Sequence, residues 1–140
     1  MNQLITKSLS YATEKHKGQV DDDGIEYIFH PIQVFRILSK VTQDPELLTA
    51  ALLHDVLEDT GTTPEEIEQI FGRRVLSLVM EVTHEGKKDN HGFYFPRLKT
   101  RDGIMIKFAD RLSNISRMSN WDKKRQEHYL NHSKFWNGEV

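Results

Sequence analysis

Apolar residues recur at spacings of three and four along most of the chain, which is the period of a helix with one buried face. The pattern predicts a first helix over residues 2–16, and no alternating run typical of a half-buried strand is sustained for long. The apolar positions of this first helix are Leu4, Ile5, Leu9 and Ala12. We therefore expect an all-α fold class.

The second helix is predicted to follow a break in regular structure. The acidic stretch 21–24 ends in a glycine, and Pro31 suits the first turn of a helix. This places His30 at the entrance of the second helix. Its apolar positions are Ile32, Phe35, Leu38 and Val41.

The third helix carries several start signals in a row. Asp44 can cap it, Pro45 suits its first turn, and Glu46 favours the positive end of the helix dipole. We expect this helix to continue from Leu47 to Asp59, and Gly61 helps to end it.

The middle of the chain is predicted to hold two further helices and a long loop. Residues 63–66 combine a capping-box spacing with a proline at the first helical position, and the short helix that they start ends near 71–72. Another helix is predicted from about Arg74 to Thr83. Residues 84–99 mix glycine, proline, charged and aromatic residues, which favours a loop. Because a loop this long in a compact domain is often functional, we expect it near the site.

The helical pattern returns near the end of the chain, over residues 101–118 and again over 122–135. The apolar positions of the first of these helices are Ile104, Phe108, Leu112 and Ile115. The aromatic residues of the tail are expected to pack against the body of the protein rather than to stack on bases. They are Trp121, Tyr129, Phe135 and Trp136.

The composition is that of a soluble globular protein: 140 residues, 37% hydrophobic and 29% charged, which we interpret as a single domain over residues 1–140. No apolar run reaches the roughly 20 residues that cross a bilayer, and the first residues lack a secretory signal, so we expect a cytoplasmic protein. A net charge of −2 predicts no nucleic-acid or membrane partner. The sequence does not indicate the oligomeric state. With seven histidines and no cysteine, any metal would have nitrogen and oxygen ligands.

Four ionisable side chains interrupt an otherwise apolar segment, residues 50–59. On a continuous helix His54 lies one turn before Glu58, and Asp55 one turn before Asp59, so that the four form one polar stripe. Partly buried groups of this kind are costly unless they are paired, hydrogen-bonded or bound to a cation. A metal site would explain them. The alternative is a helix end that becomes polar as it reaches solvent.

Two further residues extend the candidate site. His30 precedes a proline, and Asp110 is an acid within an otherwise apolar helix. Each has a structural alternative when it is taken alone: His30 could cap a helix end, and Asp110 could pair with Lys107 or Arg111.

Taken in order, His30, the pair His54-Asp55 and Asp110 resemble the H…HD…D pattern of the HD-domain phosphohydrolases. The segments around them are similar to the hydrolase domain of RelA/SpoT proteins and to the small alarmone hydrolases. These segments are residues 24–31, 50–60 and 107–114, and residues 71–72 and 82–83 also fit. The similarity extends from about His16 to Met118.

This resemblance implies an HD-type helical bundle that uses Mn²⁺ to remove the 3′-pyrophosphate from guanosine tetra- and pentaphosphate. It assigns the metal to His30, His54, Asp55 and Asp110. It assigns the nucleophilic water to Glu58 and Asp59, and contacts with the nucleotide substrate to Asn114 and Tyr27.

Basic residues near Asp110 are candidates for binding the phosphates of the substrate, although charged residues on helix faces and loops are usually solvated. The candidates are Lys107 and Arg111, together with Arg97, Lys99 and Arg101. The remaining histidines are expected to lie on the surface or to have no catalytic role. They are His84 and His91 in the loop, and His16, His128 and His132 elsewhere.

The chain departs from the alarmone hydrolases in two places. They usually have basic residues between Gln19 and Gly24, whereas this chain has Val20 followed by aspartates at 21–23, and it has Arg117 where a small or hydroxyl residue is expected. Three acids would repel a polyphosphate. Hydrolysis of another nucleotide or phosphate ester therefore stays open as an alternative.

Two hypotheses from other classes also stay open. The chain could be a catalytically silent metal-binding module, although such a module would not need both Glu58 and Asp59. It could also be a purely structural helical bundle, which would leave the polar stripe unexplained.

Overall fold

The structure is a computed structural model that describes residues 2–88, 94–96, 98–117 and 122–132. Eight helices and one hairpin occur in this described part. The helices are α1 (Gln3–Lys15), α2 (Phe29–Leu38), α3 (Pro45–Leu52), α4 (Val56–Asp59), α5 (Pro64–Phe71), α6 (Arg73–Val82), α7 (Arg101–Ser116) and α8 (Lys123–His132). The strands are β1 (His84–Lys88) and β2 (Tyr94–Pro96).

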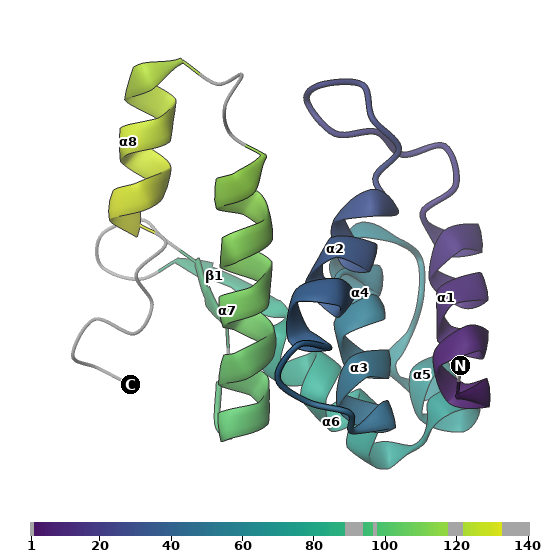
Figure 1. The fold of residues 1–140 in the computed structure, drawn as a ribbon. Helices are drawn as coiled ribbons and strands as arrows, with labels where there is room; N and C mark the ends of the chain where they lie inside the picture. The colour runs from purple at the N-terminus through teal and green to yellow at the C-terminus, as the bar shows by residue number, and fades with distance from the viewer. Residues whose placement is uncertain (1, 89–93, 97, 118–121, 133–140) are drawn as a thin grey trace.

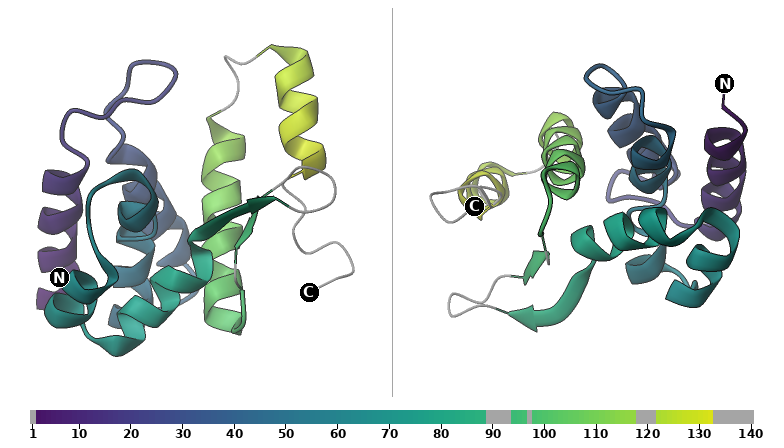
Figure 2. Two further views of the ribbon diagram at one scale, coloured as in Figure 1. Left: turned by 180° about the vertical axis from the view of Figure 1, so that it is seen from behind. Right: turned by 90° about the horizontal axis from the view of Figure 1, so that it is seen from below.

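The helix α3 lies at the centre of the molecule and packs against α1, α2, α6 and α7 (Figure 1). All of its residues from Leu47 to Leu52 are buried, and a helix that is apolar on every side is typical of a core position. The helix α2 packs along α7, and α8 lies on the far side of α7 from α1 in each view (Figure 2). The all-α fold class is confirmed, with the hairpin as a small addition.

Five of the described helices begin at a polar residue whose side-chain oxygen accepts a backbone N–H from the first turn. These caps are Asn2, Asp44, Thr63, Thr100 and Asp122. The starts predicted at Asp44 and at Thr63 are confirmed, because each signal acts within one turn of the chain and needs no distant partner.

The prediction of one helix from Leu47 to Asp59 is wrong. The helix ends at Leu52, and a turn over residues 53–55 separates it from α4. In this turn the N–H of Val56 bonds to the carbonyl of Leu53, a spacing of three residues instead of four. The tightened turn removes His54 from regular helix and places it with Asp55 between two helices.

The apolar face predicted for α7 is also wrong. Phe108 and Leu112 are exposed, whereas Ile106, Ala109 and Asp110 are buried. The face with the larger apolar side chains points outward, because the helix buries the face that carries Asp110 against α2. Val41, predicted on the second helix, lies beyond the end of α2 and is 70% exposed.

The segment predicted as a loop over residues 84–99 contains the antiparallel hairpin of β1 and β2, with His84 opposite Pro96 and an irregular register further along. Side chains of the hairpin, including His84, and residues 89–93, including His91, lie outside the described residues. So do Arg97, Trp121, Phe135, Trp136 and the side chains of Tyr129 and His132, so these predictions are not tested.

The start of α7 is fixed by the buried side chain of Glu81. Its Oε1 accepts the N–H groups of Lys99 and Thr100, both at 2.7 Å, and its Oε2 accepts the Thr100 hydroxyl at 2.8 Å. Gly103 lies so close that a Cβ atom there would be 2.5 Å from the same Oε1. This contact sets the position of α7, which carries Asp110 to the site. None of the described helices is both long and apolar enough to cross a membrane.

Candidate metal centre

Three helical regions bring together the residues of the candidate centre. His30 lies in the first turn of α2, His54 and Asp55 lie in the turn between α3 and α4, and Asp110 lies in the middle of α7. Ligand atoms of His30, His54 and Asp110 all lie within 4.8 Å of one another. The central packing of α3 against both α2 and α7 produces this convergence.

The two imidazole Nε2 atoms face the two carboxylates. The Nε2 of His30 is 2.9 Å from Oδ1 of Asp110 and 3.7 Å from Oδ2 of Asp55. The Nε2 of His54 is 2.9 Å from Oδ2 of Asp55 and 3.4 Å from Oδ1 of Asp110. Asp55 therefore lies beside the other three residues.

The opposite nitrogen of each ring is held by a protein acceptor. The Nδ1–H of His54 donates to the carbonyl of Ala51 at 2.7 Å. The hydroxyl of Ser113 donates to Gln33 at 2.7 Å, so its oxygen is left to accept the Nδ1–H of His30 at 2.9 Å. These contacts direct both Nε2 lone pairs into the site, which is the usual arrangement of metal-binding histidines.

The donor set fits a divalent cation. The Nε2 of His54 is buried and makes no hydrogen bond with any described residue, although two carboxylates lie close to it. A buried polar atom without a partner is costly, and a cation between nitrogen and carboxylate ligands would satisfy it. Two imidazoles and two carboxylates suit transition metals such as Mn, Fe, Co or Zn.

The electrostatics of the metal-free site show how strongly these groups interact. Burial alone would lower the pKa of His54, but the carboxylates of Asp55 and Asp110 raise it well above the ordinary value of 6.5. Burial would raise the pKa of both aspartates, but His54 lowers the pKa of Asp55, and Lys107 followed by the histidine contacts lowers that of Asp110. A cation would thus replace the histidine proton between the two carboxylates.

Tyr27 and Asp59 extend the site along its edge. The Tyr27 hydroxyl donates to Oδ2 of Asp55 at 2.5 Å, and burial followed by the Asp55 charge raises the pKa of Tyr27. Burial and then the Asp55 carboxylate also raise the pKa of Asp59. Glu58 precedes it at the exposed end of α4. The N–H of Asp59 bonds to the Asp55 carbonyl at 3.0 Å, so Asp59 lies next to this candidate ligand.

The predicted phosphate contacts that lie within the described residues do not form one cluster. Lys107 is buried, with its Nζ 3.2 Å from Oδ2 of Asp110. Arg111 follows Asp110 and is partly buried. Arg101 is exposed at the start of α7, about 13 Å along the helix axis from Asp110, and Lys99 is also exposed.

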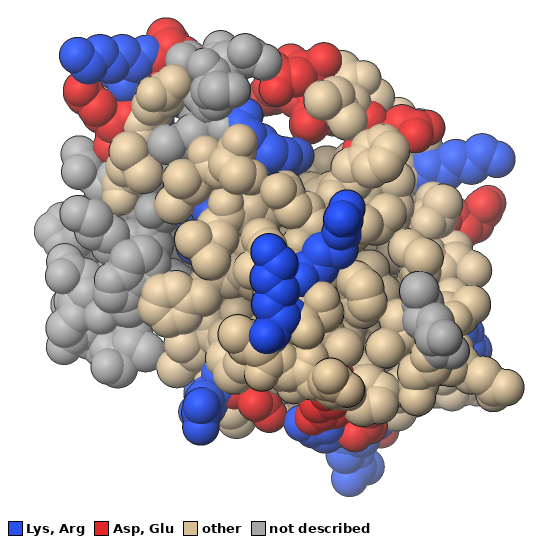
Figure 3. All heavy atoms as spheres, in the orientation of Figure 1, with Lys and Arg blue, Asp and Glu red and all other residues tan. Residues whose placement is uncertain are grey.

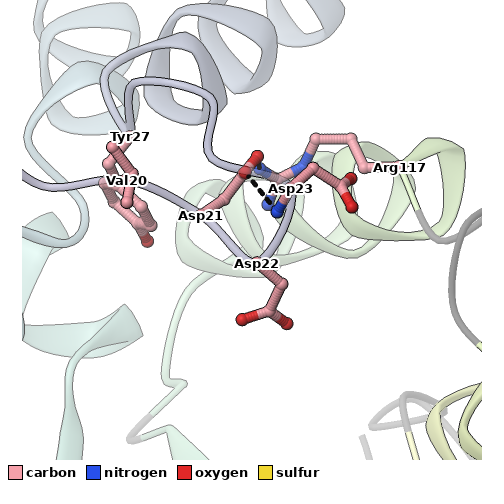
Figure 4. A pocket seen from close by; sticks show the side chains of 6 residues that line it. All are labelled: Val20, Asp21, Asp22, Asp23, Tyr27 and Arg117. Atoms are coloured by element: carbon pink, nitrogen blue, oxygen red, sulfur yellow. Dashed lines mark hydrogen bonds and ion pairs between the residues drawn. The ribbon is translucent and has the colours of Figure 1, made fainter.

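Asn114 connects the site to a neighbouring pocket. Its Nδ2 lies 3.5 Å from Oδ1 of Asp110, and its Oδ1 accepts a hydrogen bond from Arg117 at 2.9 Å. The pocket has a volume of about 240 Å³ and is lined by Val20, Asp21, Asp22, Asp23, Tyr27 and Arg117 (Figure 4). Because Tyr27 contacts both the pocket and Asp55, the pocket adjoins the candidate metal centre.

The acidic charges of this pocket are partly neutralised. Figure 4 shows Asp21 and Arg117 facing each other, with Oδ2 and Nη1 3.3 Å apart. Asp22 points elsewhere and pairs with Arg125 of α8. In Figure 3, acidic side chains gather along the upper edge of the molecule, where the loop between α1 and α2 lies. The two departures in the sequence, Asp21 and Arg117, are thus partners in one ion pair.

Several residues that orient the ligands were missed by the sequence analysis. Ser113 and the Ala51 carbonyl are three positions from Asp110 and His54, and Gln33 is three positions from His30. Residues three apart share a helix face, so a search at that spacing from each ligand would have found them.

Comparisons with known proteins agree with this geometry. The HD domain family matches residues 8–91. A guanosine-3′,5′-bis(diphosphate) 3′-pyrophosphohydrolase of Spiroplasma citri is 37% identical over 88% of the chain, which spans 18% of that protein. The pyrophosphohydrolase MESH1 of Danio rerio is 34% identical over 91% of the chain, which spans 78% of that protein.

A solved structure has a closely similar fold. It was described in work on a metazoan ortholog of SpoT that hydrolyses ppGpp, and it superposes with a TM-score of 0.83 at 32% identity. The match covers 96% of this chain and 83% of the other. The HD-type fold class is thereby confirmed.

Proposed function

Because the chain belongs to the HD domain family, we propose that it is a metal-dependent phosphohydrolase that removes the 3′-pyrophosphate from (p)ppGpp. The observation that carries this proposal is the convergence of two imidazole Nε2 atoms and two carboxylates in one buried site. The activity in the names of relatives that the chain covers over most of their length supports the substrate. We also propose a cytoplasmic location.

We propose that His30, His54, Asp55 and Asp110 hold the metal and that the metal is Mn²⁺. A bound divalent cation would polarise a phosphoryl oxygen and lower the pKa of a water molecule. The buried Lys107 contributes by holding Asp110 in its charged form beside the site. Tyr27 orients Asp55 through its hydroxyl.

Asp59 and Glu58 are the proposed proton acceptors for the attacking water. A carboxylate with a raised pKa binds a proton more readily than an ordinary one, and the pKa of Asp59 is raised by its surroundings. Asn114, Arg111 and Tyr27 are proposed to contact the substrate from α7 and from the loop before α2.

A second candidate function is hydrolysis of a less charged nucleotide or phosphate ester. The acidic pocket favours it, because the carboxylates of Asp22 and Asp23 would repel a polyphosphate placed there. The ion pairs of Asp21 with Arg117 and of Asp22 with Arg125 reduce this repulsion, which keeps the alarmone as the first choice.

The test is phosphate and pyrophosphate release from ppGpp, pppGpp and a panel of other nucleotides, with and without Mn²⁺. We expect about one divalent ion per chain, hydrolysis of ppGpp, and a fall in melting temperature on chelation, since a ligand of the native state stabilises it. Asp55→Ala should abolish metal binding and turnover together.

Two amide variants separate the enzyme from a silent metal-binding module. Glu58→Gln and Asp59→Asn should keep the metal but lose roughly 10²- to 10⁴-fold in kcat. A wild type that binds metal and hydrolyses no nucleotide is a silent module. A wild type that binds no divalent ion contradicts the proposal as a whole.

A further inference from the structure

His16 is a buried histidine for which the sequence predicts no role. It caps the C-terminal end of α1, only 2% of its surface is exposed, and its ring centre lies 5.1 Å from that of Tyr27. Its Nε2 is buried and makes no hydrogen bond with any described residue. An imidazole in such a position is costly unless the fold or the chemistry needs it.

Gln19 connects His16 to Asp59. The Nδ1–H of His16 donates to Oε1 of Gln19 at 2.9 Å, and Nε2 of Gln19 donates to the backbone carbonyl of Asp59 at 2.8 Å. The backbone carbonyl of Gln19 also accepts the N–H of Tyr27 at 2.9 Å. Both the Oε1 and the Nε2 of the Gln19 side chain thus make a hydrogen bond, which fixes the orientation of the side-chain amide.

Asp59 needs such support because it ends a helix of only four residues. The last carbonyls of a helix have no partner within it, and a single turn has little stability of its own. The Gln19 amide supplies the missing donor from a segment 40 residues away.

We propose that His16, acting through Gln19, is a positioning residue that holds Asp59 in place for proton transfer. This inference rests on the proposed function, in which Asp59 accepts a proton from water. His16 itself binds neither metal nor substrate. Removing the link lets the end of α4 shift, and a misplacement of about 1 Å near the reacting atoms lowers rates about 100-fold.

The first test compares His16→Ala, Gln19→Ala and the double variant. Each single change should lower kcat about 10- to 100-fold, with KM and Mn²⁺ affinity nearly unchanged. Because both changes break the same link, the double variant should be no slower than the slower single variant. Losses that multiply would show that the two residues act separately and would overturn the inference.

Conservative variants of His16 separate positioning from simple folding. The amide nitrogen of Asn takes nearly the place of the imidazole Nδ1, so His16→Asn should keep the bond to Gln19 and restore most of the activity. His16→Gln places its amide nitrogen near the position of the imidazole Nε2 instead, so it should lose the bond to Gln19 and should not restore activity. Equal activity of these two variants would contradict a role through Gln19.

Tyr11→Phe is the matched control. It removes another side-chain hydrogen bond of α1, from the Tyr11 hydroxyl to Glu66, on the side of α1 that faces α5. This variant should change the melting temperature by a comparable amount and leave kcat unaltered. A similar fall in kcat in this control would mean that His16 acts only through stability.

Crystal structures of the Mn²⁺-loaded wild type and of Gln19→Ala provide a readout besides activity. The inference predicts a displaced Asp59 backbone with unmoved His30 and Asp110. An unmoved Asp59 overturns it. A wild type that hydrolyses no phosphate ester rejects the proposed function instead, and the position of Asp59 then still decides whether the link holds it.

Discussion

Each histidine of the candidate centre is oriented by the nitrogen that faces away from it. For His30 this contact is the Ser113 hydroxyl, itself fixed by Gln33, and for His54 it is a backbone carbonyl. A backbone acceptor cannot be removed by substitution, whereas Ser113 can. The ring of His30 is therefore the one whose orientation can be tested directly.

Ser113→Ala should weaken Mn²⁺ binding about 10- to 100-fold, because the His30 ring loses the acceptor that sets its tautomer. Isothermal titration with Mn²⁺ measures this change. Ser77→Ala, at an exposed serine of α6, is the control and should bind Mn²⁺ like the wild type. Unchanged affinity in Ser113→Ala would show that packing alone orients His30.

The raised pKa of His54 predicts an unusual pH dependence of the metal-free protein. Burial opposes the charged ring, but Asp55 and Asp110 outweigh it, so the folded pKa lies above the unfolded value of about 6.5. Stability from this group is fully present below pH 6.5 and is lost as pH rises through the folded pKa. In chelator, the melting temperature should fall over that window.

Saturating Mn²⁺ should reverse this trend, since the metal requires His54 without its proton and the stabilisation by metal grows with pH. The measurement is thermal unfolding from pH 6 to 9 with chelator or with Mn²⁺. His54→Gln should flatten both curves. A metal-free wild type whose melting temperature rises over this window would show that His54 is neutral when folded.

At the scale of elements, local sequence signals predict where helices start, but they do not predict the turn that separates α3 from α4. Asp44 and Thr63 cap their helices within one turn, so the sequence alone predicts them. The turn over residues 53–55 contains no glycine or proline, the residues that usually indicate a break in a helix. The turn follows a helix that packs against four others, so contacts distant in sequence determine its position.

The four proposed ligands could be predicted because their pattern is recognisable, although the geometry first used to connect them was wrong. A continuous helix would have placed Asp55 and Asp59 on one stripe. In the structure Asp55 lies in a turn, and the N–H of Asp59 still bonds to its carbonyl at 3.0 Å. The buried face of α7 could not be predicted from hydrophobicity, because it carries Asp110 and Lys107 while Phe108 points outward.

The contact between Gly103 and Glu81 predicts a stability effect far from the chemistry. Gly103→Ala would place a Cβ atom against a carboxylate that is already fixed by three hydrogen bonds. We expect a loss of about 1–3 kcal/mol from this overpacking, measured by urea unfolding. Gly61→Ala, which meets nothing within 4 Å, is the control and should stay within about 0.5 kcal/mol. A neutral Gly103→Ala would show that α7 can move away from Glu81.

At the scale of the whole molecule, the loop between α1 and α2 joins distant parts of the chain. Asp21 pairs with Arg117 at the end of α7, and Asp22 pairs with Arg125 of α8. Asp21 also accepts the N–H groups of Asp23 and Ile25, so its carboxylate shapes the loop itself. Replacing Asp21 would therefore change both the fold of the loop and its charge, whereas replacing Asp22 breaks only its exposed ion pair with Arg125.

The last prediction concerns the effect of this loop on substrate choice. If the pocket beside Tyr27 receives part of ppGpp, Asp22→Lys and Asp23→Lys together should lower its KM, because two acidic side chains become basic and Arg125 loses its acidic partner. The effect should shrink between low and moderate ionic strength, since charges more than about 10 Å apart interact little in 0.1 M salt. A substrate with fewer phosphates should respond less.

Steady-state kinetics with ppGpp and with a nucleoside monophosphate, each at two salt concentrations, measures both dependences. Lys123→Asp and Lys124→Asp provide the control, because they alter the charge of α8 at exposed positions whose side chains do not line the pocket. If the double variant and the wild type have the same KM for ppGpp at both salt concentrations, the polyphosphate binds away from this pocket. The metal centre and the ion pair of Asp21 with Arg117 would then set the specificity without the two exposed aspartates.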